Sequence, residues 1–548
     1  MSAGGRFLVG LLPGRADLIA ARRSPGRDLL AGLTVAVVAL PLALAFGVAS
    51  GLGAEAGLTT AVIAGALAAI FGGSNLQVSG PTGAMTVVLI PVVHQFGAAG
   101  VLQVGVMAGV ILLALALSGI ARYVRYLPTS LVEGFTAGIA VVIALQQLPN
   151  ILGVKPGPQE KVWEIAIDAI TTFVRTPNPT ALIIAVGVAA VIVLGSRWKP
   201  SLPLSLGAVV AATAIAYFFA PSLDIVGALP AGLPAPAAGF FEPASMIALL
   251  PSAVAVAALA ALESLLCATV ADAMSVGQQH NPDRELFGQA IANLVVPFFG
   301  GVPATAAIAR TAVNVKAGAH SRIAALSHSV VLLMFMLVAA PLVGIIPLAA
   351  LGGVLLATTV QMVQVGAIRS ILRSSRGDAV VLILTFAVTV MVDLVTGVII
   401  GLVLAGIVAL RAVAKSAQVA RVPLDTSDHT DEEQRLLDDR IVAFRLDGAL
   451  FFGAAHRFLL ELSEVADVAV VILRMGRLST IDATGALMLD DAIARLEKRG
   501  ITVLLSGIRP GHRKVLDALT SATRLTHAGL VFAETPDAIE HARALART

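Results

Sequence analysis

The stretch LQVSGPTGAMTVVLIPVV, residues 76–93, is too apolar for a surface loop, yet five residues break it near its start: Ser79, Gly80, Pro81, Thr82 and Gly83. A second stretch, GGVPATAAIARTAVNVKAG at 300–318, has the same order of residue types. Pro81 and Pro303 are each expected to open an apolar helix that is too short to cross a membrane. The two interrupted stretches therefore predict one half-helix in each half of the chain.

The composition indicates a membrane protein with many spans. Hydrophobic residues make up 57% of the 548 residues and charged residues 13%, and the mean hydropathy is +0.91. Apolar runs, roughly fourteen in number, recur between about residues 28 and 412, and such runs form helices in lipid. The single cysteine excludes an intrachain disulfide framework. The small net charge of +3 is scattered, which gives no support for nucleic-acid binding.

The distribution of Lys and Arg predicts that both termini lie in the cytoplasm. No cleavable signal peptide is evident, and arginines precede the first long apolar run. With a cytoplasmic N-terminus, the basic residues of many connections collect on the cytoplasmic side: Arg122, Arg125, Arg197, Lys199, Lys316, Arg322, Arg369, Arg373, Arg376, Arg411 and Lys415. An even number of spans follows, and we expect a multi-pass protein of the plasma membrane.

Four parts are expected along the chain. Residues 1–27 form a cytoplasmic N-terminal segment, and 28–416 form the transmembrane domain, with one repeat at about 28–220 and a second at about 245–416. Residues 417–439 read as a polar linker. In 440–548, the strand patterns IVAFRLDGALFF, VAVVILRM and ITVLLSGI alternate with helical spacing in GALMLDDAIARLEKRG and DAIEHARALA. This last part is therefore predicted to be a small cytoplasmic α/β domain.

The matched pair of half-helices points to an anion site. An inverted repeat of seven plus seven helices would make the two half-helices meet head to head near the middle of the membrane. The N-terminus of a helix has unpaired N–H groups and carries roughly half an elementary positive charge, so two such ends attract an anion. The alternative is that Gly and Pro merely kink the two helices, and the matching order of residue types argues against it.

Five motifs in register resemble the SulP family of anion permeases. They are DLLAGLTVAVVALPLALAFGVASGLGAEAGL, GGSNLQVSGPTGAMTVV, ALESLLCATVADAM, GGVPATAAIARTAVNVKAG and a C-terminal STIDATGA. The resemblance implies a fold of fourteen spans in a seven-plus-seven inverted repeat, with a core domain that moves against a gate domain. It also implies a cytoplasmic STAS domain and a homodimer. The bicarbonate permease branch is the most similar, and the proton-coupled dicarboxylate permeases are similar too.

The resemblance and the physics of helix ends together assign a substrate site. Phe46 matches the aromatic residue of the first span that closes the anion pocket in the family, although a lone Phe in a membrane helix is more often a packing residue. Backbone N–H groups are expected to face the anion from two triplets, Thr82, Gly83 and Ala84, and Thr305, Ala306 and Ala307. Arg310 is expected to add positive charge. Its alternative is a side chain that extends to the cytoplasmic water near a helix end.

Glu263 is the candidate for coupling, because a carboxylate inside an apolar run is costly unless it has a partner or a function. It would carry a proton, or pair with Arg310, or help to bind a cation. In the sodium-coupled relatives this position is Asp, followed four residues later by Thr, whereas this chain has Glu263 and Cys267. Sodium prefers oxygen ligands to a thiol. The coupling ion is therefore expected to be H⁺ rather than Na⁺.

The motif RLSTIDATGALMLDDA resembles the phosphorylation loop of STAS proteins, which present a serine directly after the Asp. This chain has Ala483 there, so a phosphorylation switch at that position is not expected. Asp482 and Thr484 are the regulatory candidates, and the simpler alternative is that one of them caps the following helix. The STAS domain is expected to support assembly or regulation, and a cytoplasmic protein partner is left open.

The predicted function is secondary active transport of a small anion. No nucleophile constellation, phosphate-binding loop or metal-ligand cluster occurs in the sequence, so neither an enzyme nor a cofactor is expected. Bicarbonate is favoured because only one cation, Arg310, is evident at the site. A C4-dicarboxylate and sulfate are the alternative substrates. A passive anion channel or a STAS-linked sensor is the alternative of another class, and transport driven by an ion gradient would distinguish them.

Overall fold

The computed structural model divides into two compact units, Met1–Leu402 and Val403–Thr548, which are described separately. It describes residues 10–14, 17, 19–20, 22, 24–122, 128–155, 161–198, 204–220, 222–275, 278–416, 418–421, 440–450, 468–516 and 520–546.

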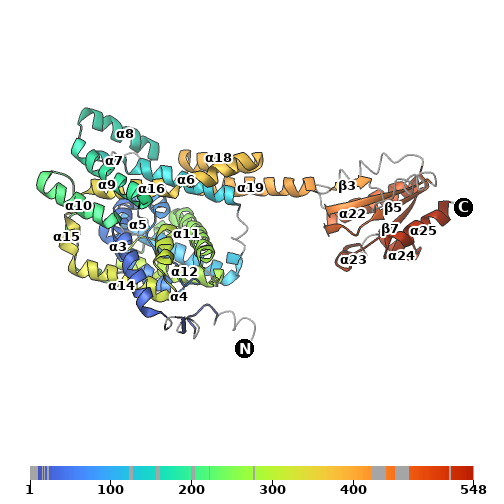
Figure 1. The fold of residues 1–548 in the computed structure, drawn as a ribbon, viewed down its shortest axis with the longest axis horizontal. Coiled ribbons are helices and arrows are strands. Elements are labelled where there is room, and N and C mark those ends of the chain that lie inside the picture. The colour runs from blue at the N-terminus through green and yellow to red at the C-terminus, as the bar shows by residue number, and fades with distance from the viewer. Residues whose placement is uncertain are drawn as a thin grey trace. The chain divides into compact units, whose positions relative to one another are not determined.

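The first unit is helical, as the apolar runs predicted (Figure 1). Its first half contains α3 (Pro25–Ala49), α4 (Ala54–Phe71), α5 (Gly83–Ser118), α6 (Thr129–Gln146), α7 (Leu148–Leu152), α8 (Val162–Arg175), α9 (Pro179–Trp198) and α10 (Leu204–Phe219). Its second half contains η2 (Pro243–Ser245), α11 (Met246–Met274), α12 (Pro282–Val295), η3 (Val296–Phe299), α13 (Ile308–Lys316), α14 (Arg322–Val338), α15 (Ala340–Gly344), α16 (Leu348–Met362), α17 (Val365–Ser374), α18 (Arg376–Met391) and the start of α19 (Leu394–Ser416), which continues into the second unit.

The two halves repeat one arrangement, which confirms the inverted repeat. Helix α5 changes direction at Gly97, where φ is +65°, so it is two helices end to end. Counted in this way, α3, α4, the two parts of α5, α6, α9 and α10 correspond to α11, α12, α13, α14, α16, α18 and α19. The packing follows the same symmetry. The second part of α5 corresponds to α14: α5 packs against α11 and α12, and α14 packs against α3 and α4.

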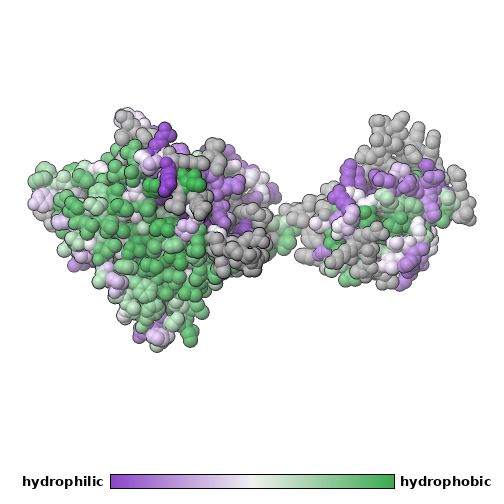
Figure 2. All heavy atoms as spheres, turned by 90° about the horizontal axis from the view of Figure 1, so that it is seen from below, coloured by the Kyte–Doolittle hydropathy of each residue, from purple (hydrophilic) through white to green (hydrophobic). Residues whose placement is uncertain are grey.

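The helices form two groups. The core group is α3, α4, α5, α11, α12, α13 and α14, and the gate group contains α6, α9, α10, α16 and α18, in which α6 packs on α18 and α9 on α16. Eight helical stretches among the described residues are long and apolar enough to cross a membrane. Figure 2 shows the broad hydrophobic surface of this unit, which is the surface expected to face lipid.

The two interrupted stretches are held together by two very short strands. Strand β1 (Ser79–Gly80) pairs antiparallel with β2 (Thr305–Ala306), with Ser79 opposite Ala306 and Gly80 opposite Thr305. The sequence had suggested that Pro81 and Pro303 open the half-helices, but neither residue does. The helices begin later, at Gly83 and Ile308, because the backbone before them is extended and bonded across the repeat. This pairing explains why both membrane segments are interrupted.

The second unit is the predicted small α/β domain. Its strands are β3 (Gln418–Arg421), β4 (Ile441–Leu450), β5 (Val470–Arg474), β6 (Leu478–Ile481), β7 (Thr502–Ser506) and β8 (Val531–Phe532). Its helices are α22 (Ala483–Lys498), α23 (Pro510–Leu516), α24 (Thr520–His527) and α25 (Thr535–Ala546). The strand order is β3-β4-β5-β7-β8, with β6 beside β4, and β3 alone is antiparallel. Helices α22 and α24 cover one face and α25 covers the other.

One boundary requires correction. The linker was predicted at 417–439, but β3 at Gln418–Arg421 pairs with β4 and so belongs to the sheet. Polar composition did not reveal this short strand, because its pairing partner lies more than twenty residues further along the chain. Residues 422–439 lie outside the described residues.

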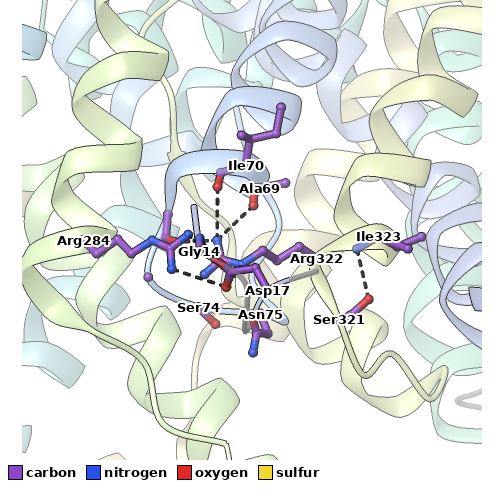
Figure 3. Close-up of polar contacts among 12 residues, drawn as sticks. Gly14, Asp17, Ala69, Ile70, Ser74, Asn75, Arg284, Ser321, Arg322 and Ile323 are labelled. Atoms are coloured by element: carbon purple, nitrogen blue, oxygen red, sulfur yellow. Dashed lines mark hydrogen bonds and ion pairs between the residues drawn. The ribbon is translucent and has the colours of Figure 1, made fainter. Parts of the chain in front are cut away.

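Asp17 joins the N-terminal segment to the second half of the helical unit, and its partner Arg322 reaches the first half (Figure 3). Its carboxylate accepts hydrogen bonds from Arg284 Nη2 at 2.8 Å and from Arg322 Nε at 3.1 Å. Arg322 also donates to the carbonyls of Ala69 and Gly72, at 3.1 and 2.5 Å, at the end of α4. Burial raises the pKa of Asp17, but the hydrogen bond from Arg284, that from Gly14 and the charges of the two arginines outweigh burial and hold this pKa below its usual value.

We expect Asp17→Asn to lower the free energy of unfolding by about 1–3 kcal/mol, because two partly buried guanidinium groups lose a charged acceptor. The stabilisation from Asp17 should be complete above the ordinary carboxyl pKa of about 4 and should be lost as pH falls through the lowered pKa. Thermal unfolding of the purified protein in detergent measures both effects. Asp224→Asn, at an exposed carboxylate, is the control, and equal unfolding temperatures for the two variants would contradict the role of Asp17.

Candidate functional site

Two helix N-termini in the core group have free backbone donors. The first intrahelical bonds run from Thr86 N–H to Thr82 O, at 3.2 Å, and from Thr311 N–H to Ala307 O, at 2.9 Å. The N–H groups of the first turn of α5, from Gly83, and of α13, from Ile308, therefore have no acceptor within their helices. Within the described part of the chain, no side chain caps either helix. Both ends are thus open to an anion.

Both helix starts line a cavity of about 1050 Å³ between the core and gate groups. From the predicted site it is lined by Phe46, Thr82, Gly83, Ala84, Glu263, Ala306, Ala307 and Arg310. It continues past α6 and α16 to polar residues such as Arg122, His280 and Gln364, so it opens toward the side of the unit that carries these residues. His280 Nδ1 lies 2.7 Å from Asp272 Oδ2 in this outer part.

Phe46, which the resemblance assigns to the anion pocket, lies against the first helix start. Its side chain is buried in α3. A Cβ atom at position 83 would come within 3.2 Å of the Phe46 ring and would also collide with Ile143. The absence of a side chain at Gly83 therefore lets the ring close directly over the backbone of α5.

Arg310 is a buried cation without an ion pair among the described residues. Its side chain is 1% exposed, which excludes the alternative of an arginine that extends to water. One nitrogen, Nη2, donates to Pro81 O at 2.5 Å, while Nε and Nη1 have no hydrogen-bond partner in the described part of the chain. A Cβ atom at Gly80 would collide with Nη1, so the guanidinium fits because residue 80 is glycine. A buried charge of this kind favours an anionic ligand.

Glu263 is joined to the first helix start through Thr82. Thr82 is a good N-cap residue by type, yet its hydroxyl donates to Glu263 Oε2 at 3.0 Å and does not cap α5. A direct ion pair between Glu263 and Arg310 had been one alternative. Among the described residues no such pair occurs within 4 Å, since Arg310 is held by Pro81 instead.

Two predicted site residues lie behind the cavity and not in it. Cys267 Sγ donates to Thr311 Oγ1 at 3.1 Å. Thr305 Oγ1 lies 2.9 Å from Ser264 Oγ and 3.1 Å from Ala260 O. The side chains of adjacent residues in a strand point to opposite sides, so Thr305 faces α11 while Ala306 faces the cavity. Both residues therefore support the paired strands.

The predicted backbone donors also shift along the second stretch. Ala306 N–H is bonded to Ser264 Oγ at 3.3 Å, and Ala307 N–H to Val78 O at 3.0 Å, so neither is free for an anion. The free donors come directly after Ala307, at Ile308 and Ala309, which the sequence analysis missed. The sequence analysis did not foresee the extended backbone of β2, which delays the start of α13 to Ile308.

Polar residues on α12 hold the crossing strands, and the sequence analysis did not single them out. Asn293 accepts from Ala304 N–H at 2.8 Å and donates to Ala304 O at 2.9 Å. Gln289 Nε2 donates to Ser79 Oγ at 2.7 Å. Both side chains are fully buried. Amides inside an otherwise apolar helix were the signal that could have identified them.

In the second unit, the structure describes the side chain of one of the two regulatory candidates. Asp482 accepts a hydrogen bond from Gly485 N–H at 2.7 Å and caps α22, which is the simpler alternative that the sequence left open. The side chain of Thr484 lies outside the described residues.

An inverted repeat with two helix starts at one cavity is an arrangement found in many membrane transporters. Residues 26–385 match the Sulfate permease family and residues 436–528 match the STAS domain, so the chain belongs to the sulfate permease family. It is an anion transporter of this family and not an enzyme.

Two relatives and one structure illustrate the similarity. A candidate sulfate transporter of Bacillus subtilis, YvdB, is 34% identical over 501 residues, which are 89% of this chain and 93% of that protein. The bicarbonate transporter BicA of Picosynechococcus is 31% identical over 513 residues, which are 90% of each chain. The transmembrane domain of a cyanobacterial BicA superposes with a TM-score of 0.63 at 34% identity, covering 69% of this chain and 98% of that one.

We expect Arg310→Ala to weaken anion binding by about 10- to 100-fold, because a hydrogen bond to a charged group contributes about 1.5–3 kcal/mol. The Kd for bicarbonate and for sulfate, measured by calorimetry on the purified protein, checks this. Arg310→Lys keeps the charge and should lose less affinity. An unchanged Kd in a monodisperse Arg310→Ala preparation would remove Arg310 from the site.

Proposed function

We propose that this protein is a secondary active transporter that moves a small inorganic anion by alternating access, with Glu263 as the carrier of a coupled proton. The observation that carries the proposal is the pair of uncapped helix starts at one cavity, with the unpaired Arg310 beside them. Thr82 supports the coupling role, because one hydroxyl links the first helix start to the Glu263 carboxylate.

The charge of the site suggests how proton and anion would be coupled. Two helix ends contribute roughly half a charge each and Arg310 contributes one, which gives about +2. With Glu263 ionised the sum is about +1, which attracts any anion, bicarbonate included, more weakly. With Glu263 protonated the sum is about +2, which suits a divalent anion such as sulfate and obliges a proton to travel with it.

Bicarbonate is the first substrate to test, since Arg310 is the one guanidinium near the helix starts in the described cavity. Sulfate is the second candidate on the charge argument, and a C4-dicarboxylate would need a further cation. Sodium coupling has less support, because the thiol of Cys267 is bonded to Thr311 and supplies no oxygen to Glu263.

We further propose that the protein is a homodimer in the plasma membrane, with both termini in the cytoplasm. The cavity then opens inward, because its outer part contains Arg122, which the charge distribution assigns to the cytoplasmic side. Movement of the core group against the gate group would close it on that side and open it on the other. A passive channel is the alternative of another class.

Uptake into proteoliposomes tests the function. We expect labelled bicarbonate or sulfate, but not fumarate, to accumulate above equilibrium when a proton gradient is imposed, and sulfate uptake to depend on the gradient more steeply. Sodium-driven accumulation would overturn the coupling proposal. Uptake that only equilibrates under every gradient would identify a channel.

We expect Glu263→Gln to abolish proton-driven accumulation while anion binding remains, because the amide fixes the neutral form of this side chain. Exchange of labelled for unlabelled anion across the membrane, which needs no gradient, should persist. Glu133→Gln is the matched control, since Glu133 lines the same cavity and forms no hydrogen bond to Thr82. Full proton-driven accumulation in Glu263→Gln would assign the coupling to another group.

A further inference from the structure

Helix α17 (Val365–Ser374) differs from the membrane-crossing helices on either side of it. It joins α16 to α18, packs against α18 and α6, and has no buried residue. Val365 is 60% exposed and Leu372 is 44% exposed. Arg369 and Arg373 lie one turn apart on the same helix. A short helix with exposed apolar and basic residues, placed between two spans, is typical of the membrane surface.

The positions of these side chains on α17 fit that placement. At 100° per residue, Val365, Ile368 and Leu372 fall within an arc of about 60°. Arg369 and Arg373 lie directly beside this arc, and Arg376 follows at the first turn of α18. The apolar arc can therefore enter the acyl region while the three guanidinium groups remain at the level of the phosphates.

Arg369, Arg373 and Arg376 have no competing acid among the residues that the structure describes. All three residues are exposed, and none forms an ion pair within the part of the chain that the structure describes. The nearest acid in sequence is Asp378. Its carboxylate accepts a hydrogen bond from Ser130 Oγ at 3.1 Å, and its backbone N–H donates to Ser375 Oγ. The arginines are thus free to bind an external anion at the membrane surface.

The first half of the chain provides an internal comparison. Helix α8 occupies the corresponding place between α6 and α9 and also has exposed apolar residues, among them Trp163, Ile167 and Val174. Its charged residues, however, are Glu164, Asp168 and Arg175. Because an inverted repeat places the two helices on opposite membrane surfaces, the basic charge belongs to one surface only. Exposed apolar residues explain membrane contact at both α8 and α17, whereas the arginines of α17 require a further explanation.

We propose that α17 forms a binding site for the headgroup of an anionic phospholipid. Arg369, Arg373 and Arg376 bind the headgroup phosphate, and Val365 and Leu372 contact the upper part of the acyl chains. Because α17 packs on α6 and α18, both of the gate group, a bound lipid anchors that group to one leaflet. The core group can then move relative to a fixed support, so that lipid charge becomes a regulator of this protein.

Native mass spectrometry of the full-length protein in detergent tests the proposal, with phosphatidylglycerol and phosphatidylcholine as probes. Each arginine at an anionic surface contributes about a fivefold factor to binding. We expect the natural protein to retain phosphatidylglycerol in preference to phosphatidylcholine, and R369Q/R373Q/R376Q to bind phosphatidylglycerol at least about tenfold more weakly. V365S/L372S should weaken the retention of both lipids.

The matched control is R22Q/R175Q/R197Q, which removes the same number of exposed arginines elsewhere and should retain the preference for phosphatidylglycerol. All variants are compared as monodisperse preparations. Equal retention of the two lipids by the natural protein would overturn the proposal. Unchanged phosphatidylglycerol affinity in R369Q/R373Q/R376Q would do so as well, and equal loss in the control would reduce the effect to net charge.

Discussion

The antiparallel pairing of β1 with β2 is the interaction on which the rest of the helical unit depends. Ser79 faces Ala306 and Gly80 faces Thr305, so two segments from opposite halves of the chain meet inside the core group. An unpaired extended backbone would leave its polar groups unsatisfied in lipid, at a cost of several kcal/mol. Each strand therefore makes the other possible, and neither half-helix could start where it does without both.

A layer of buried polar side chains supports this pairing. Asn293 bonds both backbone groups of Ala304, and Thr311 accepts from Val78 N–H at 3.0 Å. Ser264 and Gln289 hold the strands from α11 and α12. Because these side chains bond the strands from two sides, the strands and the helix starts that follow them are fixed in place before any anion arrives. Such preorganisation reduces the cost of binding.

Arg310 and Glu263, the two charged residues beside the helix starts, contact the first interrupted stretch at different points. Arg310 passes beneath Gly80 and bonds Pro81 O, which brings a full positive charge to the backbone of the first interrupted stretch. Glu263 reaches the same stretch from α11 through the hydroxyl of Thr82. The cation and the carboxylate are thus near one site without neutralising each other directly. This separation leaves both groups able to respond to an anion and a proton.

The sequence determined the class of protein, the number and symmetry of the spans and the α/β domain, and most of the site residues that it predicted line the cavity. Hydropathy, periodicity and the matched Gly/Pro/Thr stretches are local signals, which is why they could be read from the sequence. Tertiary structure decided where each half-helix begins. The pairing of 79–80 with 305–306 is a contact between residues more than two hundred positions apart, and it moved the free donors to Ile308 and Ala309. The same contact turned Thr305 away from the cavity, because side-chain direction in a strand follows from the extended backbone and not from residue type. Cys267, on α11, bonds Thr311 behind the cavity, which is again a contact between distant parts of the chain.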